Sequence, residues 1–383
     1  MRFIFKTDYE QDIKLLQHSG AWWSYGLLFA VLAAAPYFIG SYLQSQLVFV
    51  FIYAIVGVAL MILVGFTGQG SIGHAAFLAI GAYTAGYLQS RGYPFEVYFP
   101  AAGIITGVVG AIVGIPALRL HGIYLLIATI SFAFIVEEIL ARWESVTHGN
   151  EGMRVRAVEF FGQTVTRDSN SFYFLCLAVL VLVIIGTLNL MRSPTGRAFI
   201  AIPDSETAAK SMGIDLAKYK VRSFAISAAI TGLAGTLYAH KMSFISPEMF
   251  TLLLSIEFIM VIIIGGAFGL HGAILGAIFI VMVDPMITML KDDVPGMVAS
   301  LSRGLGVGEG GARAVQDWLY AIFSAPGLKG AIYGLIIIMF VLFEPMGLYG
   351  RWLKIKLYFQ LFPLYKKSTF RRQKTYVKSE RNR

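Results

Sequence analysis

Residues 192–222 read R-S-P-T-G-R-A-F-I-A-I-P-D-S-E-T-A-A-K-S-M-G-I-D-L-A-K-Y-K-V-R and form a polar interruption between two apolar runs. The stretch holds six basic residues, yet its middle has the signals of a short capped helix. Pro203 fixes φ for a helix start, and the Asp204 carboxylate is placed to accept from the free amides of the first turn. Gly213 is placed to end the helix in a left-handed conformation. Because two turns are unstable alone in water, we expect this helix to lie against another structure.

The same short helix has a charged end and an apolar side. Glu206 lies near the positive end of the helix dipole. Ala208, Ala209 and Met212 are spaced to form one apolar side. Two interpretations remain open on these residues alone: an ordinary basic cytoplasmic loop, or a helix that docks a cytoplasmic partner.

The composition places the chain among polytopic helical membrane proteins. Of 383 residues, 57% are hydrophobic and 14% are charged, whereas a soluble domain carries about 25% charged residues. The net charge is +9, but eleven of the 31 Lys and Arg residues follow Gly350, beyond the last apolar run. This position favours contact with anionic lipid and excludes nucleic acid as the expected partner. The single cysteine, Cys176, lies inside an apolar run, so we expect a buried, inert thiol.

Long uncharged runs predict an all-α polytopic membrane protein with about ten transmembrane helices and a short cytoplasmic coupling helix. The predicted spans are about 21–39, 47–65, 72–88, 97–117, 122–141, 172–191, 222–240, 249–269, 272–290 and 329–347. The third, fourth and seventh spans are rich in Gly and Ala. Small residues let helix backbones approach closely, so we expect these three spans to be buried among other helices.

The distribution of basic residues predicts the orientation. With a cytoplasmic amino terminus, 21 Lys and Arg lie inside and 10 outside, in agreement with the positive-inside rule. The predicted organisation is a cytoplasmic segment 1–20, a permease domain 21–350 and a basic cytoplasmic tail 351–383, which we expect at the lipid surface or disordered. Within the domain, 192–222 is the coupling loop, and 142–171 and 291–328 are external; the second of these is predicted to be a mobile Gly-rich loop with a short amphipathic helix near 315–323.

No motif for catalysis, for metal binding or for ATP binding is present in the sequence. There is no G-x-x-x-x-G-K-[ST], no paired-histidine spacing and no nucleophile elbow. We therefore expect no catalytic residue, no metal site and no cofactor on this chain. A membrane enzyme is the least favoured function.

Ionisable residues inside the predicted spans are candidates for a solute pathway, because burying them in a membrane is costly. His74 is more readily explained as a hydrogen-bonded packing residue, and Glu137 and Glu138 as residues that reach the interface. For Glu257 and Asp284, a pathway role and a structural pairing are equally compatible with the sequence.

Several motifs, taken in order, resemble the permease subunits of branched-chain amino acid ABC importers, of the LivM-like type. They are G-F-T-G-Q-G-S-I-G-H-A-A-F-L-A-I-G-A-Y-T-A (65–85), I-P-A-L-R-L-H-G-I-Y-L-L-I-A-T (115–129), W-E-S-V-T-H-G-N-E-G-M (143–153), S-P-T-G-R-A-F-I-A-I-P-D-S-E-T-A-A-K-S-M-G-I (193–214), S-A-A-I-T-G-L-A-G-T-L-Y-A (227–239) and I-I-G-G-A-F-G-L-H-G-A-I-L-G-A (263–277). The resemblance runs from about Leu47 to Asp284 and resumes near Gly330. It implies a polytopic permease whose pathway candidates are Gly68, Gln69, Ser71, His74, Glu257 and Asp284.

In that family, the loop that matches residues 193–214 couples the permease to an ATPase. The resemblance therefore implies a coupling role for Ser193, Pro194, Thr195, Gly196, Arg197, Asp204, Ser205, Glu206, Thr207, Ala208, Ala209, Met212 and Gly213. The family pattern commonly has Arg where Pro203 stands, a difference that would change the entry angle of the docking helix. It also has G-G-S-N-G where residues 148–152 read H-G-N-E-G.

The resemblance implies partners and a location. The partners are a second related permease, two cytoplasmic ATPase subunits that bind ATP-Mg, an external solute-binding protein and membrane lipid. The location is a bacterial inner membrane, with both termini in the cytoplasm. The alternatives are a secondary transporter or channel that works without ATP, and an ABC permease for urea, short amides or sugars.

Overall fold

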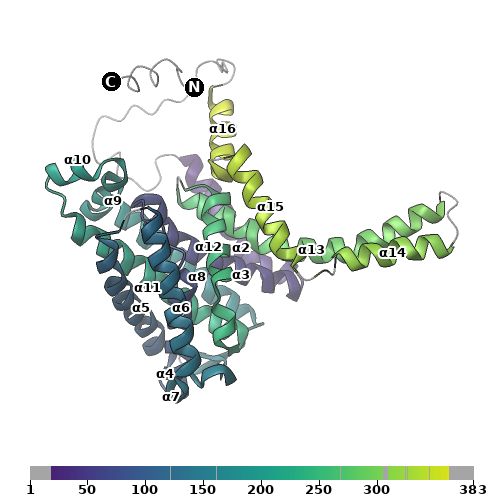
Figure 1. The fold of residues 1–383 in the computed structure, drawn as a ribbon, viewed down its shortest axis with the longest axis horizontal. Helices are drawn as coiled ribbons and strands as arrows, with labels where there is room; N and C mark the ends of the chain where they lie inside the picture. Colours follow the sequence, from purple (N-terminus) through teal and green to yellow (C-terminus); the bar gives the residue numbers. More distant parts are fainter. Residues whose placement is uncertain are drawn as a thin grey trace.

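The computed structural model describes residues 19–120, 122–160, 162–267, 269–304, 309–323, 325, 327–344 and 346–361. The predicted amino-terminal segment and the tail beyond residue 361 lie outside these residues, apart from the first turn of α2. The described chain is mostly helical (Figure 1). The helices are α2 (Ser19–Phe38), α3 (Ser41–Leu60), the π-helical η1 (Met61–Phe66), α4 (His74–Ser90), α5 (Phe95–Ala117), α6 (Ile123–Arg142), α7 (Glu144–Thr147), η2 (Gly149–Glu151), α8 (Asn170–Arg192), α9 (Pro194–Asp204), α10 (Glu206–Ser211), α11 (Leu216–Met242), η3 (Pro247–Phe250), α12 (Leu252–Gly265), α13 (Leu270–Gly304), α14 (Glu309–Phe323), α15 (Leu328–Phe343) and α16 (Gly347–Leu361).

Four short strands join the loops at the end of the body that carries α7. β1 (Met153–Arg154) pairs antiparallel with β4 (Phe244–Ile245), and β2 (Val158–Phe160) pairs with β3 (Gln163–Val165). The β1–β4 pair ties the loop after α6 to the end of α11. The predicted segment 142–171 is therefore an ordered cap of helical turns and strands on this end of the body.

Six helices in the described residues are long and apolar enough to cross a membrane. They comprise Ser41–Phe66, Phe95–Pro116, Ile123–Arg142, Asn170–Arg192, Pro247–Gly265 and Leu270–Thr288, and a seventh span results if α15 and α16, bent by 41° to each other, count as one. The predicted spans 21–39, 72–88, 222–240 and 329–347 also fall on helices, namely α2, α4, α11 and α15. By length and composition these four do not qualify singly as spans. α4 and α11 are rich in small and polar residues, and other helices rather than lipid cover them.

The centre of the molecule is α11, which packs closely against α4 and α5. A Cβ atom added to Gly235 of α11 would lie 2.1 Å from the carbonyl oxygen of Leu78 on α4. One added to Gly81 of α4 would lie 2.2 Å from the carbonyl oxygen of Gly232. These helices touch through their backbones, an approach that only glycine permits. The prediction that the small-residue spans are buried is confirmed for α4 and α11 but is wrong for α5, where only the glycine side packs against α11 and residues such as Ile104 and Ile112 are exposed.

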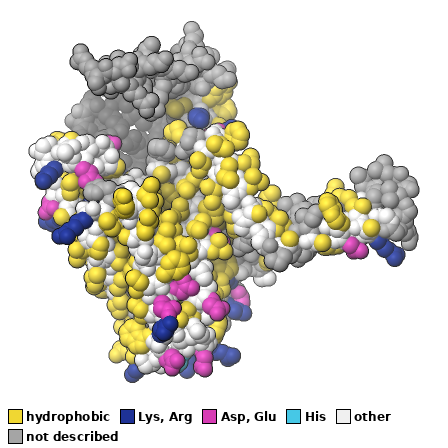
Figure 2. Space-filling model, viewed as in Figure 1, with side chains coloured by type: hydrophobic (Ala, Val, Ile, Leu, Met, Phe, Trp, Pro, Cys, Tyr) yellow, Lys and Arg dark blue, Asp and Glu magenta, His cyan; other side chains and the backbone are white. Residues whose placement is uncertain are grey.

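Charged side chains gather at two opposite ends of the body, over α9 and α10 and around the end of α6 and α7, with a largely hydrophobic band between them (Figure 2). This distribution is the one expected of a membrane-spanning body with two wet ends. α16 lies at the same end as α9 and α10 (Figure 1). The predicted segments 142–171 and 192–222 therefore lie on opposite sides, as the span count requires.

The prediction of a mobile Gly-rich loop over 291–328 is wrong for the described residues. α13 continues without a break to Gly304, and α14 runs beside it, so that the pair projects sideways from the body (Figure 1). The amphipathic helix expected near 315–323 is confirmed as the second half of α14. Among the described residues of this segment, Gly296 and Gly304 lie within α13, and Gly310 and Gly311 lie within α14, so these glycines do not interrupt the helices.

Candidate functional site

The polar interruption folds as two helices, not one. α9 begins at Ser193, whose Oγ accepts a hydrogen bond from the Gly196 amide at 3.4 Å, with Pro194 at the first helical position. This is the usual chemistry of a helix start. Ala198, Phe199 and Ile202 form the buried face of α9. The helix is therefore held firmly against the end of the body.

The cap of the second helix, α10, is Ser205. Its Oγ accepts from the Ala208 amide at 3.2 Å. The prediction of Asp204 as the capping residue and of Pro203 as the helix start is wrong, because both residues belong to the last turn of α9. The predicted stop is confirmed, since Gly213 has φ +84° and its amide donates to the Lys210 carbonyl.

The three apolar residues of α10 do not share one environment. Ala209 is buried against the body, whereas Ala208 and Met212 face outward, and Met212 is 83% exposed. Thr207 and Lys210 are also exposed, so α10 presents a mixed apolar and polar surface to the solvent at this end. A methionine this exposed beside a small residue is suited to contact with another protein.

Two groups of hydrogen-bonded polar side chains lie inward from α9 and α10, one around Gln69 and one around His74. Gln69 Nε2 donates to Thr67 Oγ1 at 3.1 Å and to Ser223 Oγ at 2.7 Å. His74 lies between Ser71 Oγ at 3.2 Å from Nδ1 and Ser227 Oγ at 2.9 Å from Nε2. All of these side chains are buried. Four of the six predicted pathway residues, Gly68, Gln69, Ser71 and His74, are thus brought together on the η1–α4 loop and the first residue of α4.

The hydrogen bonds assign the protons of His74. Ser227 Oγ donates to the Ala59 carbonyl at 2.7 Å, so it accepts from His74 Nε2. Nδ1 then accepts from Ser71 Oγ. A neutral imidazole with a proton on Nε2 satisfies both contacts, as the interpretation of His74 as a packing residue requires. In this conformation both ring nitrogens of His74 are therefore occupied by hydrogen bonds to serine side chains.

The start of α4 receives its cap from a different helix. Gly73 precedes the helix and has no side chain to cap it, but Ser255 Oγ of α12 accepts from the Ala75 amide at 3.1 Å. We expect Ser255→Ala to destabilise the protein by about 1 kcal/mol, the usual cost of losing a cap. The measurement is the midpoint of thermal unfolding in detergent. Ser131→Ala is the control, because the exposed Ser131 hydroxyl only donates to the Ile127 carbonyl of its own helix; an equal loss in both variants would contradict the prediction.

The other two pathway candidates lie apart from the η1–α4 loop. Glu257 Oε2 accepts from Tyr53 OH at 3.0 Å, and Asp284 Oδ1 accepts from Tyr333 OH at 3.2 Å. Glu257 is two residues after Ser255, so the two side chains leave α12 in nearly opposite directions. The six candidates therefore form two separate groups. Four lie on the η1–α4 loop and the start of α4, whereas Glu257 and Asp284 bind tyrosines of other helices.

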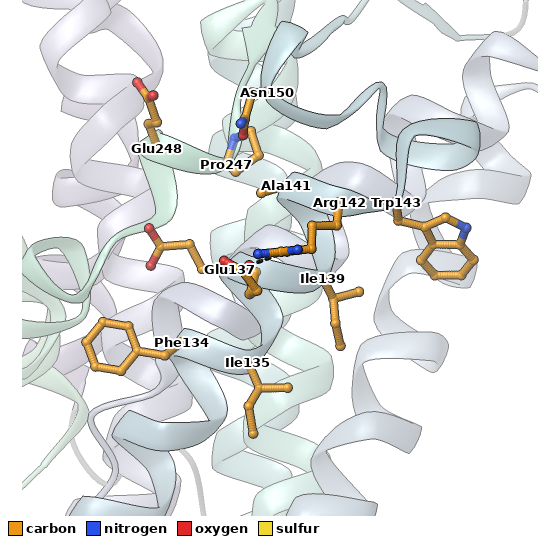
Figure 3. A pocket seen from close by; sticks show the side chains of 11 residues that line it. Phe134, Ile135, Glu137, Ile139, Ala141, Arg142, Trp143, Asn150, Pro247 and Glu248 are labelled. Carbon is orange, nitrogen blue, oxygen red and sulfur yellow. Dashed lines mark hydrogen bonds and ion pairs between the residues drawn. The ribbon is translucent and has the colours of Figure 1, made fainter.

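The opposite end of the body carries an open hollow of about 1040 Å³. Figure 3 shows Glu248 above Glu137 on the left, Arg142 to the right of both, Asn150 at the upper edge, and Phe134 and Ile135 at the lower side. Glu138 forms an ion pair with Arg142. The prediction that Glu137 and Glu138 reach the interface is supported by this position at the charged end of α6.

Next to this end, the loop before α8 is tied to α11 by an ion pair. Lys241 Nζ lies 3.2 Å from Asp168 Oδ1. Partial burial raises the pKa of Asp168, but the hydrogen bonds and charges of Lys241 and Arg167 outweigh it and hold that pKa below its ordinary value. The pair therefore persists at neutral pH and weakens only as the pH falls through this lowered pKa. It fixes the strand-containing cap to the core helix.

Sequence reasoning missed the inward side of α11. The stripe contains Lys220, Ser223, Ser227 and Thr231, all buried. Their spacing of three, four and four residues places them on one helix face, and this polar stripe in an otherwise apolar helix was a signal available in the sequence. Lys220 ends the stripe next to α10, where its Nζ lies 2.7 Å from Glu206 Oε1.

In the described residues, no group of three or more His, Cys, Asp or Glu side chains is arranged to hold a metal ion. The polar residues instead link a surface helix pair to a buried cluster at the centre of a membrane-spanning body. Residues 42–341 match the family model described as the permease component of the branched-chain amino acid transport system. The chain belongs to this family. The prediction made from the motifs is confirmed.

Individual relatives agree with this assignment. The chain is 34% and 35% identical over 255 residues to the high-affinity branched-chain amino acid transport system permease proteins LivM of Salmonella typhimurium and Escherichia coli. It is 27% identical over 271 residues to the fructose import permease protein FrcC of Rhizobium meliloti, covering 66% of this chain and 71% of that one. The match covers 60% of this chain and 60% of the length of each LivM protein. No solved structure shows a significant match.

Proposed function

We propose that the chain is a membrane-spanning permease subunit of an ATP-driven importer for branched-chain or related amino acids. It would work in a bacterial inner membrane beside a second related permease and two ATPase subunits that bind ATP-Mg. An external solute-binding protein would deliver the solute. The family membership supports the permease role, and the similarity to the LivM proteins supports the class of solute.

The observation that carries the ATP-driven mechanism is the exposed surface of α10. A six-residue helix is unstable alone, yet α10 is capped by Ser205, ended by Gly213 and joined by Glu206 to the buried Lys220. Its outward residues, Ala208 and Met212, remain uncovered in the single chain. A helix held so firmly at the surface is suited to transmit a movement of a partner protein to the membrane-spanning helices.

With this function we infer an orientation and ten spans. α9, α10 and α16 would lie in the cytoplasm with both termini, and the hollow beside Glu137 and Glu248 would face the outside. α2, α4, α11 and α15 would complete the ten spans, with α4 and α11 enclosed by the more apolar helices. The groups around Gln69 and His74 would then close the pathway above the coupling segment in this conformation.

Uptake by cells that lack the chain, and by cells that regain it, tests the function. We expect the restored cells to accumulate labelled leucine, and we expect accumulation to stop when ATP is depleted but to persist when a protonophore collapses the proton gradient. Accumulation that is lost with the protonophore while ATP remains high would favour a secondary transporter. Competition by fructose but not by leucine or valine would favour the sugar alternative, which the similarity to the fructose permease motivates.

A further inference from the structure

Lys220 is a buried cation at the junction between α10 and α11. Its side chain is 5% exposed, and its Nζ lies 2.7 Å from Glu206 Oε1 on α10. A lysine is almost never buried without a partner, because removing its charge from water is costly. The position of the ammonium group therefore depends on where α10 holds the Glu206 carboxylate.

The neighbouring Gln69 side chain has a fixed orientation. Thr67 Oγ1 donates to the Leu63 carbonyl at 2.7 Å, and Ser223 Oγ donates to the Lys220 carbonyl at 2.8 Å. Because each hydroxyl already donates its single proton to a backbone carbonyl, it can only accept a further hydrogen bond. The Gln69 amide nitrogen, which donates, must therefore face both hydroxyls. The Gln69 carbonyl oxygen is consequently turned away. It is buried and has no hydrogen-bond partner among the described residues.

Lys220, Glu206 and Gln69 line one small cavity of about 200 Å³, which Gly68 and Pro203 also line. The cavity lies between the end of α9, the start of α11 and the loop that precedes α4. A buried acceptor without a donor is unfavourable, because it has lost its hydrogen bonds to water. A lysine ammonium on the same cavity could supply that donor if it were released from Glu206.

The same loop also touches the coupling segment directly. Gly68 has φ +66°, and a Cβ added there would lie 2.9 Å from Pro203 Cβ at the end of α9. The loop of residues 67–71 therefore contacts the end of α9 through Gly68, and it lines the same cavity as Lys220. Movement of α9 and α10 would change both the contact and the cavity.

We propose that Lys220 is the positioning residue that links the movement of α10 to the loop of residues 67–71, and through Ser71 to His74 and Ser227. In the conformation described, the ammonium is held by Glu206, and the Gln69 carbonyl is left unpaired. When α10 moves away from α11, the ammonium exchanges from Glu206 to the Gln69 carbonyl, and the loop is rearranged. The inference rests on the proposed function only in that a partner ATPase supplies the movement.

The first test is hydrogen exchange of the purified chain in detergent, which needs no ATPase. In Glu206→Gln, which releases the ammonium, we expect faster exchange of the α10 amides and altered exchange of the amides of residues 67–71; adding Lys220→Met should keep the fast α10 exchange and return residues 67–71 to wild-type exchange. Lys218→Met is the matched control, because Lys218 lies on the exposed side of the same helix turn, and it should leave both segments unchanged. Faster exchange in α10 with an unchanged 67–71 loop would show a merely local ion pair and would overturn the proposal.

The second test is transport by the reconstituted complex. In Lys220→Met we expect the solute moved per ATP hydrolysed to fall by about fivefold or more, the lower end of couplings between distant sites, while ATP hydrolysis and complex assembly persist. Glu206→Gln should have the same effect, and the two together no further effect. Exchange of the charges, with Lys220→Glu and Glu206→Lys, should not restore the coupling, because a carboxylate at position 220 cannot donate to the Gln69 carbonyl.

The outcomes separate this inference from the proposed function. If the wild-type complex shows no ATP-dependent uptake, the proposed function fails, and the hydrogen-exchange result still decides the link. If wild-type uptake is ATP-driven but Lys220→Met keeps the wild-type ratio of solute to ATP, Lys220 is only structural and the link is refuted. Additive losses in the double variant would also contradict it.

Discussion

Ala208→Trp should reduce ATP-dependent uptake by about tenfold or more, the effect expected when a central contact of an interface is disrupted. Ala208 is exposed on α10, between the capping residue Ser205 and the exposed Met212, and its small side chain lets a flat partner surface approach closely. A tryptophan there would hold the partner away from the helix. Because Ala208 does not contribute to the core, the chain should insert and fold as before.

The control for this variant is Leu182→Trp, an equally bulky substitution on the exposed apolar surface of α8. It should leave uptake within about twofold, since a surface substitution away from a special feature has small effects. The measurement is uptake per unit of inserted protein, with the folded fraction checked by size-exclusion chromatography. Wild-type uptake by Ala208→Trp would mean that α10 does not contact the partner.

Gly235→Val should have the largest effect on stability, about 3 kcal/mol or more, at the upper end of overpacking effects. A Cβ at this position would lie 2.1 Å from the carbonyl oxygen of Leu78, which is backbone and cannot move aside without shifting α4. α4 carries His74 at its first position, so the separation of α4 from α11 would also break the hydrogen bond from His74 to Ser227.

The matched substitution is Gly186→Val. Gly186 lies on α8, and nothing in the described structure is within 4 Å of an added Cβ. Thermal unfolding in detergent should therefore give a midpoint near that of the wild type for Gly186→Val and a much lower midpoint, or no folded protein, for Gly235→Val. Similar midpoints for the two variants would contradict the close backbone contact between α4 and α11.

The sequence predicted best what depends on composition along a single helix. Hydropathy placed every predicted span on a helix, and the small residues of α4 and α11 correctly predicted that these helices are covered by others. Gly213 was also predicted correctly, because a left-handed residue after a short helix is a local requirement. These features do not depend on contacts with segments that are distant in the sequence.

The features that were missed depend on contacts between distant segments. Ser205 rather than Asp204 caps α10 because α9 extends through Pro203 and Asp204, which the local pattern around Pro203 did not indicate. The pairing of Lys220 with Glu206 joins two helices separated by a turn. Ser255 and Glu257 are two residues apart, yet Ser255 binds the start of α4 and Glu257 binds Tyr53, because their side chains leave α12 on opposite sides. Hydropathy alone could not separate these roles.

Affinity purification from native membranes tests whether the proposed contact between α9–α10 and an ATPase exists. The tagged chain would be extracted in detergent as wild type, Ala208→Trp and Leu182→Trp, and the co-purifying proteins would be identified by mass. We expect an ATPase with a nucleotide-binding motif to accompany the wild type and Leu182→Trp and to be lost from Ala208→Trp. A folded chain that purifies without any ATPase, and that moves solute in liposomes without ATP, would contradict it.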